Sequence, residues 1–152
     1  MKSILLAVCL AGALVAPAMA AGDDPFKAPV TDDADYKTGR AAIDSKDWKR
    51  AIAAMENASR KYRDEAAVYN WLGYAYRNTG DLDRAFRNYN FALRLDPKHL
   101  GAHEYIGEAY LMRKDVANAE KHLKTLESLC GKKCEEYQDL EKAIVAFKAK
   151  GS

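Results

Sequence analysis

The sequence predicts an all-α protein, an α-solenoid of three helical hairpins followed by one capping helix at the C-terminal end. Two observations predict this fold. Gly39, Gly73 and Gly107 recur at one constant interval, and a fixed period of this length is typical of stacked helical repeats. Between these glycines, apolar residues follow the three- and four-residue spacing of amphipathic helices rather than the alternation of strands.

The stretch from residue 66 to residue 99 shows one hairpin most clearly. Each helix carries an apolar stripe: Val68, Leu72, Ala75 and Tyr76 on the first, and Leu82, Ala85, Phe86, Tyr89, Ala92 and Leu93 on the second. Gly80 should adopt a left-handed conformation in the turn, Asp81 should cap the second helix, and Pro97 should end it. Gly73 and Gly107 are small where the two helices of their hairpins are expected to cross.

The same stretch resembles the tetratricopeptide repeat (TPR) family. Its residues match the signature of that family in type and offset: Tyr69, Leu72, Gly73, Tyr76, Ala85, Tyr89, Ala92 and Pro97. The resemblance implies a right-handed superhelix with a concave groove, in which each repeat is stabilised by its neighbours. It implies no particular ligand, because such scaffolds carry varied binding surfaces.

The register of the repeat divides the rest of the chain. In the first repeat, Asp35 and Thr38 stand at the signature positions of Tyr69 and Leu72, as expected of a degenerate repeat that caps the stack. Gly131 stands at the position of Pro97, where the regular array should end. The predicted boundaries are 1–20 signal peptide, 21–31 flexible leader, 32–65 first repeat, 66–99 second repeat, 100–133 third repeat and 134–150 capping helix.

The segment 1–20 is typical of a secretory signal peptide. Lys2 supplies a short positive region, residues 4–15 are apolar but too few to span a bilayer, and the segment Ala-Met-Ala at 18–20 suits signal peptidase. We therefore expect cleavage between Ala20 and Ala21, and a periplasmic or secreted protein that is not inserted in the membrane. A retained membrane anchor is the less favoured alternative, because no apolar run continues past Ala20.

Cleavage would leave the segment 21–152 with a net charge of +1, because the whole chain carries +2 and Lys2 is the one charged residue removed. A nearly neutral chain has no strong attraction to nucleic acid, and we expect no such partner. Cys130 and Cys134 would be the remaining cysteines, and an oxidising compartment favours a disulfide between them. A thiol-redox or metal-handling role is the alternative, because Cys134 should lie at a helix start beside two lysines.

No catalytic residue, metal or cofactor is expected. The sequence has no glycine-rich loop on a strand and no arrangement of a nucleophile with a base. His99 and His103 are four positions apart and could share a helix face, but two imidazoles alone make a poor metal site. His103 falls at a packing position, and we expect His122 to be exposed on an outer helix.

The family resemblance places a peptide-binding groove on the first helix of each repeat. Carried over one position at a time, the groove residues are Tyr36, Arg40, Asn70, Trp71, Tyr74, Arg77, Asn78, Glu104, Tyr105 and Glu108. Asparagine can hydrogen-bond a peptide backbone, and tyrosine offers a flat apolar surface with a polar tip. The lysine and asparagine clamp of chaperone-binding relatives is absent, because Tyr36, Trp71, Gly101 and Tyr105 stand at its positions.

The sequence as a whole predicts a non-enzymatic, exported adaptor that binds a protein or peptide segment in this groove. A structural subunit of an envelope complex is a further alternative. The partner and the oligomeric state stay open.

Overall fold

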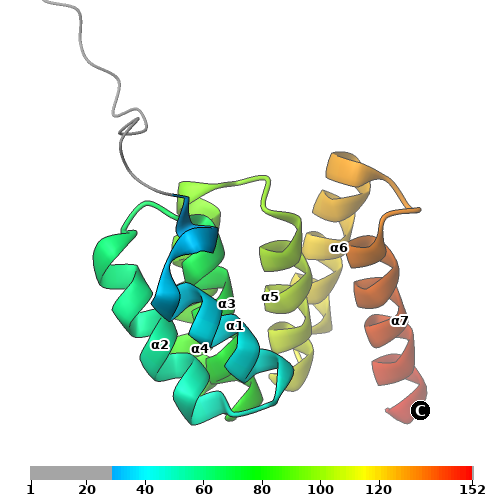
Figure 1. Cartoon of the computed structure of the whole chain (residues 1–152). Helices are drawn as coiled ribbons and strands as arrows, with labels where there is room; N and C mark the ends of the chain where they lie inside the picture. Colours follow the sequence, from blue (N-terminus) through cyan, green and yellow to red (C-terminus); the bar gives the residue numbers. More distant parts are fainter. Residues whose placement is uncertain (1–28, 152) are drawn as a thin grey trace, which may run out of the picture.

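The computed structural model describes residues 29–151, which form seven α-helices and one short 3-10 turn and contain no strand. The elements are η1 (Val30–Asp32), α1 (Ala34–Asp44), α2 (Trp48–Lys61), α3 (Ala66–Asn78), α4 (Leu82–Leu95), α5 (Leu100–Met112), α6 (Val116–Cys130) and α7 (Glu135–Lys150). They stack in chain order, with α1 and α2 at one end and α7 at the other (Figure 1). The predicted all-α solenoid is confirmed. The predicted signal peptide and most of the predicted leader lie outside the described residues.

The second helix of each hairpin starts with the same capping residue. Asp47, Asp81 and Asp115 recur at the same interval as the glycines. Each carboxylate accepts a hydrogen bond of 2.9 to 3.1 Å from the backbone N–H three positions further on. Such a bond satisfies one of the N–H groups that a helix start leaves unpaired. The cap therefore fixes where α2, α4 and α6 begin.

A left-handed residue precedes each of these caps. Gly80 has φ +81°, which confirms its predicted role in the turn between α3 and α4. The equivalent residues of the other two hairpins are not glycines: Lys46 has φ 59° and Lys114 has φ 61°. Residues with a Cβ adopt this conformation at a cost. The turn geometry is thus kept even where the residue does not favour it.

Two glycines allow the helices of a hairpin to approach closely. A Cβ atom on Gly73 would lie 2.5 Å from the ring of Tyr89 in α4, and one on Gly39 would lie 2.8 Å from the terminal methyl group of Met55 in α2. Gly107 differs from the prediction, because its close neighbour is Leu140 of α7, at 2.6 Å. The residue equivalent to Tyr89 in the third hairpin is the smaller Leu123, and Leu140 packs against the glycine instead.

The apolar core extends along the stack. One cluster joins the first two hairpins to α5, and a second forms where α5, α6 and α7 meet, around the fully buried Leu126 and Leu140. Val30 belongs to the first cluster, although it falls in the last part of the predicted leader. Packing therefore begins slightly before the predicted start of the first repeat. Among the described helices, none combines the length and the apolar character that crossing a bilayer requires.

Candidate functional site

The first helices α1, α3 and α5 bring the predicted groove residues into one row of aromatic rings. Trp71 Nε1 donates a hydrogen bond of 3.1 Å to the hydroxyl of Tyr36, which joins α3 to α1. The ring centre of Tyr74 lies 5.8 Å from that of Trp71 and 4.8 Å from that of Tyr105 on α5. Trp48, at the start of α2, reaches Tyr74 from the side, with the ring centres 6.1 Å apart. A continuous aromatic surface thus spans all three hairpins.

Two arginines lie against this aromatic row. The guanidinium carbon of Arg40 is 3.5 Å from the centre of the Trp71 ring, a cation–π contact. Arg77 lies 5.2 Å from the ring of Tyr74 and forms an ion pair with Glu108 on α5. Arg40 Nη1 and Arg77 Nε are enclosed and have no hydrogen-bond partner among the described residues. Arg77 is therefore held by Glu108 of α5, whereas Arg40 lies over the tryptophan and forms an ion pair of 3.9 Å with Asp44 of its own helix.

Exposure of the groove residues changes regularly along each first helix. The first groove residue on each of α1, α3 and α5 is buried. The exposed fractions are 9% for Tyr36, 2% for Asn70 and 8% for Glu104. One turn later the side chains are half-buried: Arg40, Tyr74 and Glu108. One further turn exposes them: Asp44, Asn78 and Met112. The accessible part of the groove therefore lies towards the C-terminal ends of these helices.

Asn70 differs most from its predicted role. Its amide was expected to face a bound peptide, but it is buried against α5, where a Cβ on Gly101 would lie 3.5 Å from its Nδ2 atom. Asn70 Oδ1 has no hydrogen-bond partner among the described residues. Asn78 is exposed, and its side chain donates to the carbonyl oxygen of Tyr74.

Acidic side chains gather where α5 faces α7. Burial is the first cause that raises the pKa of Glu104 to about 8, and the neighbouring carboxylates of Glu108, Asp139 and Glu136 raise it further. Arg77 acts in the opposite direction. The capping helix therefore contributes negative charge to the groove as well as packing to the core. Sequence reasoning missed this contribution, because the family resemblance assigns groove residues to the first helices of the repeats.

A hollow of about 410 Å³ lies between α5 and α7 next to these acids, and we call it the α5–α7 hollow. Its apolar lining comes from Leu111, Met112, Ala143, Ala146 and Phe147. Arg77, Glu108, Lys114 and Lys150 complete it. A second hollow of about 490 Å³, the α4 hollow, is lined by Tyr69, Arg87, Asn88, Asn90, Phe91 and Arg94.

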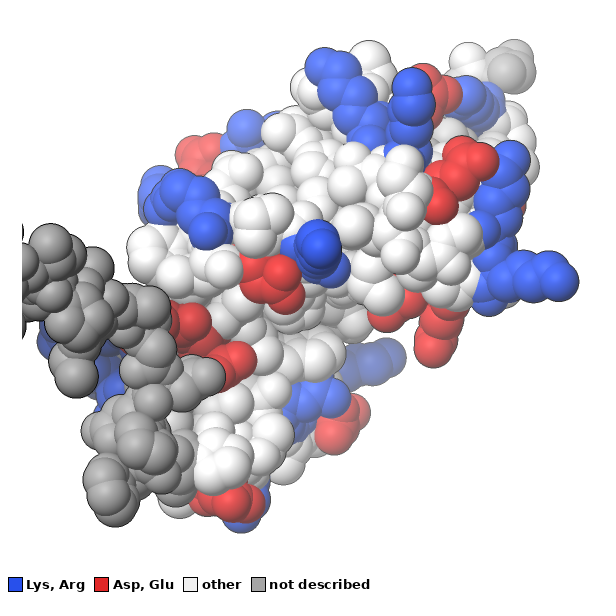
Figure 2. Space-filling view, turned by 90° about the horizontal axis from the view of Figure 1, so that it is seen from above, with Lys and Arg blue, Asp and Glu red and all other residues white. Residues whose placement is uncertain are grey.

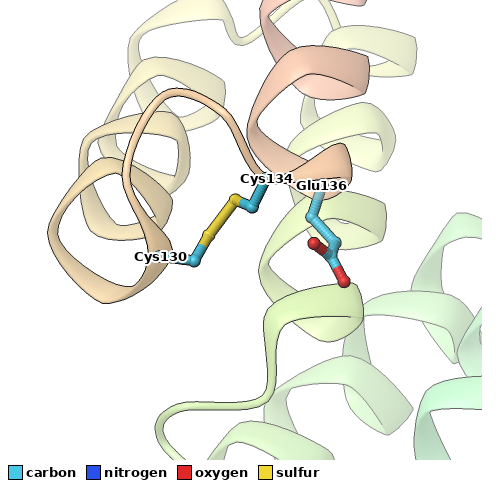
Figure 3. A group of neighbouring side chains, drawn as sticks. All are labelled: Cys130, Cys134 and Glu136. Atoms are coloured by element: carbon cyan, nitrogen blue, oxygen red, sulfur yellow. A yellow bond between two sulfur atoms is a disulfide. The ribbon is translucent and has the colours of Figure 1, made fainter.

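The two described cysteines connect α6 to α7. Cys130 ends α6 and Cys134 immediately precedes α7, and a disulfide joins them (Figure 3). Glu136 follows on the first turn of α7, and one ligand atom from each of the three residues lies within 4.8 Å of the others. Sulfur atoms bonded to each other offer no thiolate to a metal ion. In this oxidised state the loop acts as a tether between two helices.

His103 pairs with His122 rather than with His99. The Nδ1 atoms of His103 and His122 are 2.9 Å apart, and Nε2 of His103 is 3.0 Å from the carbonyl oxygen of Pro97. His99 instead caps the start of α5. The expected exposure of His122 is wrong, because the side chain packs on His103 and Tyr110 of α5. Burial, and then His103, lower the pKa of His122 to about 4.

Charged side chains of both signs are mixed on the face that Figure 2 shows. Lysines and arginines alternate there with aspartates and glutamates, and uncharged surface lies between them. Neither sign forms a continuous patch on that face.

Comparison with known proteins assigns the family. The family model described as tetratricopeptide repeat matches residues 36–89 and 79–130. The chain belongs to the tetratricopeptide repeat family. In this TPR protein the matched residues extend from α1 to the end of α6, so that α7 follows them.

Proteins similar to this TPR protein match it over different shares of their own length. Human Superkiller complex protein 3 is 35% identical over 101 residues, which are 62% of this chain but 6% of that protein. The TPR2B domain of yeast Sti1, solved as a complex with pHsp70, has a TM-score of 0.70 at 16% identity and covers 76% of this chain and 94% of its own. The Yersinia enterocolitica chaperone SycD, with a peptide of the translocator YopD, has a TM-score of 0.66 at 19% identity and covers 78% and 92%. At these identities the two structures show the fold alone.

Proposed function

We propose that this protein is an exported, non-enzymatic adaptor that binds an extended segment of a partner protein along α1, α3 and α5. One observation carries the proposal: the half-buried rings of Trp71, Tyr74 and Tyr105 contact one another across two repeats. Aromatic rings held in this way offer a large apolar contact area at little entropic cost, as binding hot spots do. The yeast domain and the Yersinia chaperone were both solved with a partner molecule, which supports a role in binding.

Exposure separates the residues that contact the partner from those that support them. Arg40, Trp71, Tyr74 and Tyr105 retain accessible surface and form the contact face. Tyr36 lies beneath this face and orients the indole of Trp71 through their hydrogen bond. Asn70 is buried against α5, so we expect it to make no contact with the partner.

Photo-crosslinking tests the location of this face. A photoreactive residue replaces Asn78, exposed at the end of α3 beside the row, or Asn90, exposed on α4 in the α4 hollow. We expect a partner adduct from position 78 and none from position 90. An adduct from position 90 alone would move the binding surface to the α4 hollow.

A matched pair of arginine variants tests the same proposal in solution. Arg40 covers the ring of Trp71, and Arg94 lies 4.9 Å from the centre of the Phe91 ring on α4. Arg40→Ala should weaken capture of the crosslinked partner, whereas Arg94→Ala should not. Both residues have accessible surface, so melting temperatures close to the wild-type value are expected and will be measured beside the capture.

Export is part of the proposal and rests on the segment 1–20 of the sequence. The intact mass of protein recovered from the cell envelope or the medium tests it. The mass of a chain that begins at Ala21 would support export and cleavage, and the mass of the full-length chain would contradict both.

A second function, metal handling by the reduced thiols of Cys130 and Cys134, is favoured by Glu136, whose carboxylate offers a third ligand atom within 4.8 Å of the two sulfur atoms. Replacing both cysteines by serine separates the two functions. A variant that still binds the crosslinked partner supports the adaptor. A variant that folds normally but no longer binds the crosslinked partner supports a function of the two thiols themselves.

A further inference from the structure

Glu104 is an acid without a partner at the wall between α5 and α7. It is 8% exposed, and it forms neither a hydrogen bond nor an ion pair with any residue of the described chain. Polar groups buried to this extent are ordinarily paired. The enclosed, unpaired polar atoms are Arg40 Nη1, Asn70 Oδ1, Arg77 Nε and Tyr89 Oη, and the oxygen atoms of Glu104 are not among them. Its carboxyl group therefore keeps an opening through which a ligand can reach it.

The charges around Glu104 do not neutralise it. Three further carboxylates act on it, those of Glu108, Glu136 and Asp139. The nearby cation is Arg77, which is already paired with Glu108. The site therefore carries excess negative charge and is partly shielded from water. The electrostatic attraction of an added cation is stronger there than in water. The ring of Tyr105, on the next residue, belongs to the aromatic row and adds a surface that attracts cations.

The α5–α7 hollow adjoins this acidic site through Glu108, which lines it. Its lining is mainly apolar, and Met112 is 51% exposed, so the hollow presents uncovered apolar surface. Lys114 and Lys150 also line it. These lysines repel a positive side chain from the hollow itself. A positive side chain is therefore favoured at the acidic site around Glu104.

We propose that the space between α5 and α7 binds a segment of the partner protein that carries a lysine or arginine side chain next to an apolar side chain. The cation pairs with the carboxylate of Glu104, which gives up its proton when the segment binds, and the apolar side chain enters the α5–α7 hollow. This inference rests on the proposed function and adds the chemistry of the segment that is bound. An acidic segment is disfavoured, because its charge would meet the carboxylates of Glu136 and Asp139.

Selection from a library of short random peptides, with acetylated and amidated ends, tests the inference on the purified full chain. The wild-type chain should enrich peptides with a lysine or arginine close to a leucine, isoleucine, methionine or phenylalanine. Glu104→Gln keeps the shape of the side chain but cannot lose a proton to form a carboxylate. This variant should lose the preference for basic residues and bind the selected peptides about tenfold more weakly. Glu135→Gln removes one charge from an exposed residue of the first turn of α7 and should behave as the wild type.

A second variant tests the apolar half of the inference. Met112→Gln changes an exposed side chain, so the fold should be unaffected, and it should lower the enrichment of apolar residues while keeping that of basic ones. The outcomes are distinguishable. If no peptide is enriched by the wild-type chain, both the inference and the proposed groove binding fail. If peptides are enriched without a basic residue, or if Glu104→Gln keeps the basic preference, the inference fails and the groove proposal remains.

Discussion

Equivalent residues on the three first helices differ in how their polar groups are satisfied. Tyr36, Asn70 and Glu104 occupy the same position of the repeat, and all three are buried. The hydroxyl of Tyr36 accepts a hydrogen bond from Trp71, whereas Asn70 Oδ1 is enclosed and has no partner in the described chain. The oxygen atoms of Glu104 are not among the enclosed atoms without a partner. An unpaired buried polar group lowers stability, so its presence points to a ligand or to a specific packing requirement.

At this scale we predict that Glu104 makes stability depend on pH. Its pKa is raised to about 8 from an ordinary value of 4.5, so the folded state holds a proton that the unfolded state has lost. The contribution of Glu104 to stability should therefore fall as pH rises from about 4.5 to about 8. His122, with its pKa lowered to about 4, contributes in the opposite direction below about pH 6.5, so the comparison with Glu104→Gln isolates the effect of the carboxyl group. The carboxylates of Glu108, Glu136 and Asp139 cause the rise together with burial, and Arg77 opposes it.

Denaturant unfolding of the wild type and of Glu104→Gln over this pH range measures the effect. The glutamine variant should lose most of the decline and be more stable at pH 8, by about 1–3 kcal/mol. Glu135→Gln is the control and should keep the wild-type slope. Parallel slopes for the wild type and Glu104→Gln would show that the carboxyl group is ionised in the folded state at neutral pH.

Which residues occupy the groove positions could be predicted from the repeat register, but their exposure could not. The register places Asn70, Tyr74 and Asn78 on one face of α3. It does not tell that α5 of the next hairpin covers the amide of Asn70. The pairing of His103 with His122 was missed for a similar reason. Both depend on the side chains of a neighbouring helix, and a pattern within one helix carries no information about them.

The helices of this protein begin and end at capping and turn residues that can be recognised in the nearby sequence. The three aspartate caps and the glycine of the central turn are examples, and each acts close to its own place in the chain. For this reason the hairpins and the start of α7 could be predicted closely. The contact of Gly107 could not, because Leu140 lies in a helix outside the repeat signature.

The left-handed lysines give a prediction at the scale of the turn. Lys46→Gly and Lys114→Gly remove a Cβ from a conformation that disfavours one. Each should raise the free energy of unfolding by about 0.5–1 kcal/mol. Lys124→Gly, at an exposed position inside α6, is the control and should lower it by a similar amount. Thermal melts of the three variants decide the matter, and a loss of stability at position 46 or 114 would contradict the turn geometry.

The close approach at Gly73 gives a second prediction for the elements. Gly73→Leu places a bulky side chain where even a Cβ would lie 2.5 Å from the ring of Tyr89. It should lower the free energy of unfolding by roughly 3 kcal/mol. Gly101→Ala is the control, because a Cβ there makes ordinary contacts at 3.5 Å or more. Chemical denaturation of both variants is the measurement, and an unchanged midpoint for Gly73→Leu would mean that α3 and α4 pack differently.

As a whole, the molecule is a stack whose last hairpin is covered by α7. The packing of Leu126 and Leu140 closes the core at this end, and the Cys130–Cys134 disulfide holds α7 to α6 beside it. A closed loop restricts the unfolded chain more than the folded one. The disulfide should therefore contribute to stability, and it also helps to keep α7 in place beside the α5–α7 hollow.

We predict that replacing Cys130 and Cys134 by serine lowers the free energy of unfolding by about 1–3 kcal/mol. Reductant should have the same effect on the wild type and none on the variant. The measurement is chemical denaturation with and without dithiothreitol, beside a count of free thiols in the native protein. Two free thiols without reductant would show that the bond is absent in solution.

Helix contacts in this protein are mostly between neighbours in the chain, as α1 with α2, α3 with α4 and α5 with α6. The chain therefore has a low contact order, and little loop entropy is lost before the first favourable contacts form. Hairpins of this kind can pair as soon as both of their helices are free to fold, without waiting for the later hairpins. The α5–α7 hollow would then be the last part to form, because it requires the final helix.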